Sequence, residues 1–313
     1  MNPKLVAWVE QYLFFPNWYQ KLISIALLPL TLIYCILVAL KRINAKPINF
    51  GLPIISIGNL IVGGSGKTPI TISLAKEYED AFIVLRGYKR QTKGLQIVSL
   101  NGDIKLDVKE AGDEAILLAQ NLPNSSVIVS ENRKEAILKA KELGAKIVFL
   151  DDGFSKVDIY KYDILLRPKI EPENIFCLPS GGYRDTKMLY SNADLVLKDG
   201  TDFERKVWFS KDENEIKKLP ENITLLTSIS KPNRLKEFLS DDVKMIAYED
   251  HHSFTQDEVE QIKSESIIVT RKDKVKLDVL NIKKNIYVME LDIEYLNKEV
   301  KGKIKNYYET YHN

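Results

Sequence analysis

Short apolar runs alternate with polar segments of helical spacing along most of this chain. Four of the runs have strand length, at residues 53–57, 81–85, 126–130 and 146–150. Strands that are apolar on both faces are typical of parallel sheets with helices on either side. The segments at 111–121 and 133–143 have the length and spacing of such helices. The pattern therefore predicts an α/β fold with a mostly parallel sheet.

The same alternation continues toward the C-terminus. Residues 98–108 predict a hairpin around Asn101-Gly102, and 163–166 and 194–197 predict two further strands. After about residue 210 the chain becomes richer in lysine and glutamate, and a second set of strands is predicted at 223–228, 243–247, 266–270 and 285–289. We therefore expect three parts: an N-terminal segment at 1–46, a larger α/β domain at 47–210 and a smaller α/β domain at 211–313.

The N-terminal segment differs from the rest. Residues 4–21 are rich in aromatic side chains, and residues 22–40 carry no charge, which is close to the length that spans a bilayer. Pro29 lies within this run and predicts a kink. Basic residues follow directly at Lys41 and Arg42, which favours a cytoplasmic position for the bulk of the chain. The segment predicts a membrane-inserted or membrane-lying anchor; a buried core helix is the alternative.

Composition narrows the functional classes only a little. The net charge of +2 is close to neutral, so no basic surface for nucleic acid is expected. The two cysteines, Cys35 and Cys177, have no metal-site spacing and form no disulfide framework, which is consistent with a reducing compartment.

A glycine-rich turn joins the first predicted strand to the following helix, and the chain there is GNLIVGGSGKTP at 58–69. Such a turn directs backbone N–H groups and a helix N-terminus at phosphate oxygens, which predicts a nucleotide phosphate-binding loop (P-loop). Ile61 stands where the strict spacing of this motif has glycine. The residues expected to bind the phosphates are Gly63, Gly64, Ser65, Gly66, Lys67 and Thr68, with the Thr68 hydroxyl on Mg²⁺.

A second signal lies at Asp151 and Asp152, which end an apolar strand. Aspartate at this point holds Mg²⁺ beside a phosphate-binding loop in many nucleotide-binding sheets. The alternative is an aspartate that caps the next helix. Together with Lys67 and Thr68, the pair favours the magnesium role.

Other polar residues allow two interpretations each. Asp113 and Glu114 precede a helical segment and could simply stabilise its N-terminus. Arg133 follows a strand, where ligands gather in open α/β sheets, although a surface ion pair is equally compatible. His251 and His252 lie in a polar loop without further metal ligands nearby, where a histidine could orient an acid or base.

These pieces, in this order, resemble the tetraacyldisaccharide 4'-kinase family, the lipid A 4'-kinases of Gram-negative bacteria. The resemblance covers essentially the whole chain. Besides the apolar N-terminal segment and the P-loop, it rests on LRGYKR at 85–90, GDEAILLA at 112–119, VIVSENR at 127–133, LDDGF at 150–154, LPSGGYRD at 178–185, SISKP at 228–232, EDHHSF at 249–254 and VTRKDKVKL at 269–277.

The resemblance implies transfer of the γ-phosphate of ATP to the 4'-hydroxyl of a tetraacylated glucosamine disaccharide 1-phosphate, giving lipid IVA. Asp113 is implied as the general base, with His251 as its partner from the smaller domain, so that domain closure would assemble the site. The implied partners are the lipid A disaccharide 1-phosphate precursor and inner-membrane lipids, with the enzyme anchored at the cytoplasmic face of the inner membrane.

The resemblance also assigns phosphate and metal contacts. Lys67, Thr68, Asp151 and Asp152 are implied as contacts to phosphates and Mg²⁺, Arg133 as a neutraliser of phosphate charge, and Asp185 as support for the metal or substrate. The chain departs from the family pattern at Leu85, Ser155, Lys156 and Asp185, where the family usually has serine, glutamine, histidine and glutamate. These departures bear on substrate contacts more than on the nucleotide site.

A membrane-associated P-loop switch ATPase or GTPase is the competing interpretation. It uses the same Lys67, Thr68 and Asp151. It gives no reason for an acid–histidine pair, and the sequence has no N-K-x-D guanine-reading motif.

Overall fold

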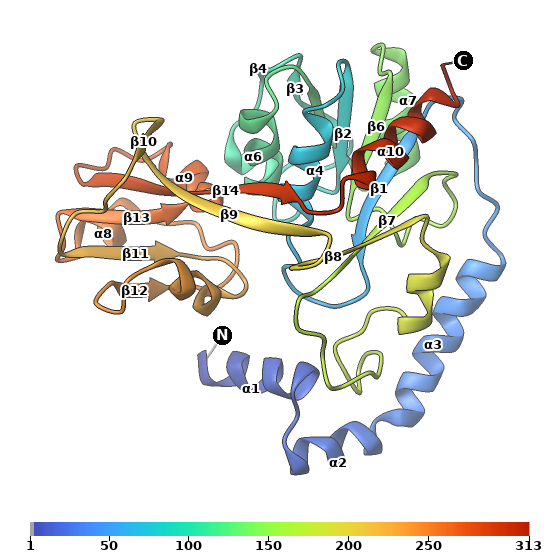
Figure 1. Cartoon of the computed structure of the whole chain (residues 1–313), viewed down its shortest axis with the longest axis horizontal. Coiled ribbons are helices and arrows are strands. Elements are labelled where there is room, and N and C mark those ends of the chain that lie inside the picture. Colours follow the sequence, from blue (N-terminus) through green and yellow to red (C-terminus); the bar gives the residue numbers. More distant parts are fainter. Residues whose placement is uncertain (1–2, 313) are drawn as a thin grey trace. The chain divides into compact units, whose positions relative to one another are not determined.

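The computed structural model describes residues 3–312, and the chain divides into two compact units (Figure 1). The first unit contains residues up to 67 together with 147–204 and 295–312, and the second contains 68–146 and 205–294. Both are therefore discontinuous in sequence. The C-terminal helix α10 (Glu299–Glu309) groups with the first unit rather than with the sheet that precedes it. The expected division at residues 46 and 210 stays a prediction.

A parallel sheet organises the first unit. Its strands are β1 (Ile54–Asn59), β6 (Ile147–Asp151), β7 (Tyr162–Arg167) and β8 (Leu195–Lys198), paired in parallel in the order β6-β1-β7-β8. All residues of β1 and β6 are buried, as expected for strands covered on both faces. A short 3₁₀ helix, η1 (Lys187–Asn192), precedes β8. The register sets Ile57 beside Asp151, so the ends of β1 and β6 are adjacent.

The second unit begins at Thr68, within α4 (Lys67–Ala75), and contains helices that alternate with short strands. Its other elements in this part are β2 (Ala81–Leu85), β3 (Gln96–Leu100), β4 (Asp103–Ile104), α5 (Val108–Ala111), α6 (Asp113–Asn121), β5 (Ser126–Val129) and α7 (Arg133–Glu142). β2 and β5 pair in parallel, whereas β3 pairs antiparallel with both β5 and β4. Asn101 and Gly102 both have positive φ, as the predicted hairpin turn requires.

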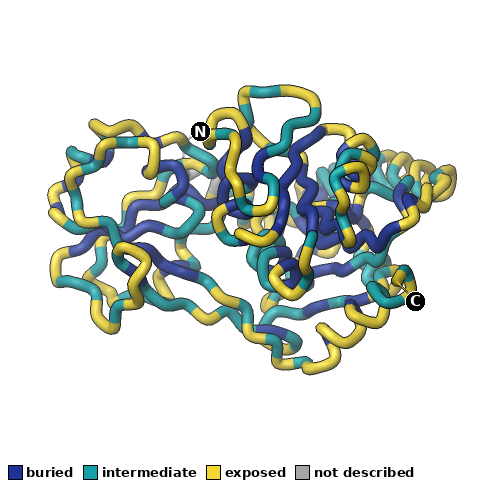
Figure 2. The backbone as a smooth tube through the Cα atoms, turned by 90° about the horizontal axis from the view of Figure 1, so that it is seen from above, coloured by how far each residue is buried: buried dark blue, intermediate teal, exposed yellow. Residues whose placement is uncertain are grey.

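A six-stranded sheet completes the second unit, in the order β10-β9-β14-β13-β11-β12. Its elements are β9 (Phe203–Lys211), β10 (Asn214–Ile216), β11 (Ile223–Thr227), η2 (Pro232–Phe238), β12 (Lys244–Ala247), α8 (Gln256–Glu260), β13 (Ser266–Thr270), α9 (Arg271–Leu277) and β14 (Asn285–Tyr295). The four predicted strands correspond to β11, β12, β13 and the first half of β14. The β9–β10 hairpin is not among the predicted elements. Figure 2 colours the backbone by burial, and every residue of β11 is buried.

The helix predicted at 111–121 corresponds to α6, which begins at Asp113, and the break that separates it from α5 matters for the site. Gly112 has a φ of 90° and ends α5, and α6 begins at the next residue. Because this φ strongly favours glycine, the chain turns here and a new helix N-terminus forms at Asp113. The carbonyl oxygen of Tyr88 lies 3.0 Å from where a Cβ on Gly112 would stand, so the loop after β2 also passes close by.

The N-terminal segment folds as three helices, α1 (Pro3–Phe14), α2 (Trp18–Ala26) and α3 (Leu28–Ile43). The predicted kink occurs at Leu27, and Pro29 lies in the first turn of α3, where it needs no N–H donor. Among the described residues, no single helix has the length and apolarity to cross a bilayer. The pair α2 and α3 meets both conditions together and bends by 57° at its break.

Candidate active site

The loop between β1 and α4 has the backbone of a phosphate-binding turn. Gly63 and Gly66 have φ values of 90° and 80°, which other residues rarely adopt, so glycine is needed at both positions. Lys67 begins α4 and Thr68 follows it. The Lys67 ammonium donates to Asn59 Oδ1 at 3.3 Å and lies 3.8 Å from an oxygen of Asp152. The predicted loop residues therefore lie at a helix N-terminus, where backbone N–H groups and the helix dipole favour an anion.

A segment of the predicted LPSGGYRD motif holds the start of this loop. Val62 N–H donates to the Gly182 carbonyl at 2.9 Å, and Arg184 N–H donates to the Leu60 carbonyl at 2.7 Å. Tyr183, which is fully buried, lies between them. The motif therefore forms a backbone scaffold for the phosphate-binding loop.

Asp151 and Asp152 lie where β6 ends. Asp151 is buried and adjacent in register to β1, while Asp152 has a φ of 55° in the left-handed region. The turn is tight, because a Cβ on Gly153 would lie 2.9 Å from the Ser56 hydroxyl and 2.6 Å from Leu150. Both carboxylates are thereby held at the carboxyl end of the strand that neighbours the phosphate loop.

Arg184 is a member of this site that sequence reasoning did not single out. Its guanidinium donates to both carboxylate oxygens of Asp152, at 3.1 and 3.2 Å, and also to the Asn59 side chain. A planar donor with several N–H groups suits carboxylate and phosphate alike. The sequence feature that could have identified Arg184 is its position in the LPSGGYRD stretch at 178–185.

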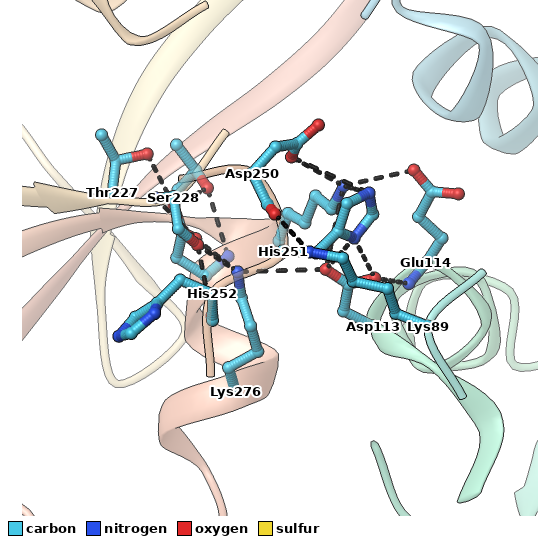
Figure 3. A network of polar contacts seen from close by, with 12 residues as sticks. Lys89, Asp113, Glu114, Thr227, Ser228, Asp250, His251, His252 and Lys276 are labelled. Atoms are coloured by element: carbon cyan, nitrogen blue, oxygen red, sulfur yellow. Dashed lines mark hydrogen bonds and ion pairs between the residues drawn. The ribbon is translucent and has the colours of Figure 1, made fainter. Parts of the chain in front are cut away.

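A second group of polar side chains surrounds Asp113 at the N-terminus of α6 (Figure 3). Nδ1 of His251 lies 2.9 and 2.8 Å from the two carboxylate oxygens, and both side chains are almost completely buried. Gly112, not Asp113, occupies the N-cap position of the helix, and the Asp113 carboxylate accepts a hydrogen bond from the N–H of the next residue, Glu114. The side chain of Asp113 is therefore directed to His251 rather than used as a helix cap.

Two lysines of α9 complete the surroundings of Asp113. Lys272 Nζ lies 3.8 Å and Lys276 Nζ 3.9 Å from its carboxylate. Burial raises the pKa of this carboxyl, but the His251 hydrogen bond and the lysine charges outweigh burial and hold the pKa at about 2. Asp113 is consequently a carboxylate at neutral pH, as a proton acceptor must be.

The loop that carries His251 is fixed by several contacts. His251 itself has a φ of 61°, and its N–H donates to the Ser228 carbonyl at 3.1 Å. Lys89 donates to the carbonyl of Asp250 at 3.0 Å, and the Tyr88 ring lies 5.1 Å from the imidazole. A non-glycine residue in this conformation costs free energy, so its surroundings must determine it.

Comparison with known proteins assigns the chain to a family. The family model for tetraacyldisaccharide-1-P 4'-kinase matches residues 23–309. The chain belongs to this kinase family.

Individual relatives agree with the family model. The tetraacyldisaccharide 4'-kinase of Aliarcobacter butzleri (strain RM4018) is 60% identical over 298 residues, which is 94% of each chain. That of Helicobacter pylori (strain ATCC 700392 / 26695) is 44% identical over 290 residues, or 91% of this chain and 90% of the relative. The crystal structure of LpxK from Aquifex aeolicus in complex with ATP superposes with a TM-score of 0.75 at 27% identity, and covers 91% of this chain and 99% of that one. Family membership favours a kinase over a switch ATPase or GTPase.

In this kinase family member, Asp113 and His251 lie in the same compact unit. The expectation placed them in different domains and relied on closure to join them. The two side chains are already in contact, and the loop that carries His251 is held by bonds to Ser228 and Lys89. Domain closure on nucleotide binding stays a prediction.

The remaining predicted residues have defined surroundings. Arg133 begins α7 after the N-cap Asn132, is buried, and donates to the Ser130 carbonyl. Asp185 is buried and forms a bidentate pair with Arg42 of α3, at 2.8 and 3.4 Å. His252 pairs with Glu258 at 3.1 Å, away from Asp113. The roles of Arg133 and Asp185 stay predictions.

Proposed function

We propose that the chain transfers the γ-phosphate of ATP to the 4'-hydroxyl of a tetraacylated disaccharide 1-phosphate, with Asp113 as the general base. The hydroxyl oxygen forms a bond to the γ-phosphorus, the bond from that phosphorus to the β,γ-bridging oxygen breaks, and ADP leaves. The hydroxyl proton passes to Asp113. The observation that carries the proposal is the buried Asp113–His251 pair, for which a nucleotide switch has no use.

The nucleotide would be held by the loop at 63–68. Its glycines provide the backbone curvature, Lys67 neutralises phosphate charge, and Arg133 is proposed to contribute further positive charge. The ATP complex of the Aquifex aeolicus relative supports ATP as the donor.

Mg²⁺ is proposed as the metal, held by the Thr68 hydroxyl and by Asp151 or Asp152, with Asp185 as support. Among residues 3–312, no group of three or more histidine, cysteine or acidic side chains is arranged for a metal ion. This donor set nevertheless fits Mg²⁺, because Mg²⁺ at kinase sites takes one or two carboxylates and completes its octahedron with phosphate oxygens and water. When bound, the ion neutralises charge on the transferring phosphoryl group.

The proposed location is the cytoplasmic face of the inner membrane. In α2 and α3 the usual polarity is inverted: Ser24 and Thr31 are buried, while many apolar side chains are exposed. Thr31 bonds the Ser180 hydroxyl at 2.7 Å, and Ser24 bonds the Asn174 amide at 3.2 Å. The large exposed apolar residues of the pair are Trp18, Tyr19, Leu22, Ile23, Ile25, Leu30, Leu32, Ile33, Ile36, Leu37, Leu40 and Ile43. Exposed apolar side chains in this number suit a membrane interface, where the proposed acylated substrate would also lie.

The decisive experiment measures transfer of labelled γ-phosphate from ATP to the purified disaccharide 1-phosphate in detergent micelles. Wild type should form product only with Mg²⁺ present, and Asp113→Ala should lose activity about 10²-fold or more. His251→Asn should also be impaired, whereas the matched variant His252→Asn should stay within a few-fold of wild type. If wild type hydrolysed ATP without phosphorylating the lipid, the kinase function would be refuted and a switch ATPase favoured.

A further inference from the structure

Asn59, the last residue of β1, contacts two cations at the phosphate-binding end of the sheet. It is buried, and its Oδ1 accepts hydrogen bonds from Lys67 Nζ at 3.3 Å and from Nη2 of Arg184. All three residues belong to the first unit. Lysine and arginine side chains carry donors and no acceptor, so the amide atom that faces them must be the oxygen. The two cations therefore determine the orientation of the Asn59 amide.

The amide nitrogen of Asn59 is used at the start of the phosphate-binding loop. It donates to the Ile61 carbonyl at 2.7 Å. Ile61 stands where the strict motif has glycine, and its backbone also forms a β-bridge with Tyr183. One buried side chain thus connects the backbone at the start of the loop to Lys67 and Arg184.

Asp152 completes a ring of four groups with these residues. Arg184 donates to both of its carboxylate oxygens, at 3.1 and 3.2 Å, and Lys67 Nζ lies 3.8 Å from one of them. Two cations therefore alternate with two acceptors, of which one is a carboxylate and the other is a neutral amide. Two positive charges and one negative charge leave a net positive charge at the N-terminus of α4, which favours an anion there.

The neutrality of Asn59 affects how strongly it competes for the two cations. A carboxylate attracts a cation through its full charge, whereas an amide oxygen attracts it only through a dipole. An aspartate at position 59 would compete with phosphate oxygens for Lys67 and Arg184 and would cancel the net positive charge of the group. Asparagine orients the same two cations and leaves that charge in place.

We propose that Asn59 is a positioning residue, whose neutral oxygen holds Lys67 and Arg184 side by side for the phosphates of ATP. This inference rests on the proposed function, in which the loop at 63–68 binds ATP. Asn59 acts through the two cations and through the Ile61 carbonyl, without contact to the nucleotide. It therefore extends the phosphate-binding machinery to a residue that precedes the glycines of the loop.

ATP binding by the detergent-solubilised full-length protein, measured by isothermal titration calorimetry with Mg²⁺ and without lipid, tests this role. Asn59→Asp preserves the shape of the side chain and adds a charge, so ATP binding should weaken about tenfold or more. Asn59→Ser stays neutral but is too short to reach both cations, so binding should weaken about threefold. Shape alone would rank aspartate closest to asparagine, whereas the proposal ranks it last.

Asn121→Asp is the matched control. It adds the same charge and removes an amide bond of the same kind, which Asn121 donates to the Leu117 carbonyl at the far end of α6. Its ATP affinity should equal that of wild type. In steady-state transfer assays the KM for ATP should rise in both Asn59 variants, and the KM for lipid should not change. A loss of folded protein alone would lower kcat and leave both KM values unchanged.

Two results would overturn the proposal. The first is an ATP affinity of folded Asn59→Asp that equals or exceeds the affinity of Asn59→Ser. The second is wild-type ATP affinity in a folded Asn59→Ser protein, which decides the matter even where Asn59→Asp does not fold. The proposed function would fail by a different result, namely ATP binding by wild type without phosphate transfer to the lipid.

Discussion

At the scale of single residues, the site depends on charges that compensate one another away from water. Asp113 is stable as a buried carboxylate only because His251, Lys272 and Lys276 lie around it. Lys272 in turn stays charged because of three carboxylates. Removing one of these residues leaves an uncompensated buried charge. The resulting loss of folding stability exceeds what the intact ion pair contributes to it. Variants here therefore require a test of folding beside every test of activity.

The shifted pKa of Asp113 predicts a pH dependence of stability. The folded-state pKa of about 2 lies below the ordinary 3.8, so the carboxylate stabilises the fold above about pH 4. This contribution, about 2 kcal/mol, is lost as the pH falls toward 2. Urea unfolding of wild type and Asp113→Asn should show a constant difference in unfolding free energy above pH 4.5 and a shrinking one below pH 4. The exposed Asp103→Asn should differ little from wild type at any pH, and a difference for Asp113→Asn that grows toward low pH would contradict the assignment.

At the scale of elements, close backbone approaches define the phosphate-binding end of β1. A Cβ on Gly58 would lie 2.5 Å from Cβ of Phe154, which is buried in the turn after Asp152. Neither the strand nor the turn has room to move, because β1 is buried along its whole length. The geometry of the phosphate-binding loop thus depends on Gly58, which precedes the glycines at 63, 64 and 66.

Two glycine-to-alanine variants are expected to shift stability in opposite directions. Gly58→Ala should destabilise the protein by about 2 kcal/mol or more through overpacking. Gly302→Ala, in the exposed interior of α10 with nothing within 4 Å of the added Cβ, should stabilise it by about 0.5–1 kcal/mol. Chemical denaturation of both variants checks this. A neutral Gly58→Ala would mean that the turn at Gly153 adapts easily.

At the scale of the whole molecule, the N-terminal helices combine inward polar contacts with an outward apolar surface. Tyr34 donates to the Arg184 carbonyl at 2.6 Å, and Arg42 binds Asp185, so α3 contacts the segment that also supports the phosphate loop. A membrane surface bound by α2 and α3 would therefore be connected to the nucleotide loop through one short stretch of chain, residues 182–185. This connection lies within the first unit.

Membrane binding should depend on the apolar surface of α3. Leu32→Gln combined with Leu37→Gln should reduce co-sedimentation with phospholipid vesicles by about tenfold, because two exposed leucines leave the interface. ATP binding should stay unchanged. The matched control is Leu138→Gln with Leu296→Gln, which alters two exposed leucines elsewhere. Equal sedimentation of the two double variants would rule out this surface as the anchor.

Much of the fold was determined by the sequence through local patterns. Buried strands such as β2 and β6 are continuous apolar runs, and the glycines at 63 and 66 are needed for local backbone conformation alone. The short helix α5 that ends at Gly112 and the hairpin β9–β10 were not predicted. A single glycine in a helical stretch is ambiguous, and the alternation in β9 is interrupted by charged residues.

Only the tertiary structure decided which polar groups meet. Asp113 and His251 are 138 residues apart, and neither residue's local pattern distinguishes a base from a helix-terminal acid or a loop histidine. Lys272 lies in a lysine-rich stretch and Arg184 beside a second charged residue, and neither spacing distinguishes a buried side chain from a solvated one. Likewise, the apolar run at 22–40 indicated a membrane segment, but its bend and its inward-facing Thr31 depend on partners near residue 180. Local conformation is determined by neighbours in the chain, whereas burial and charge pairing are determined by distant segments that only the fold brings together.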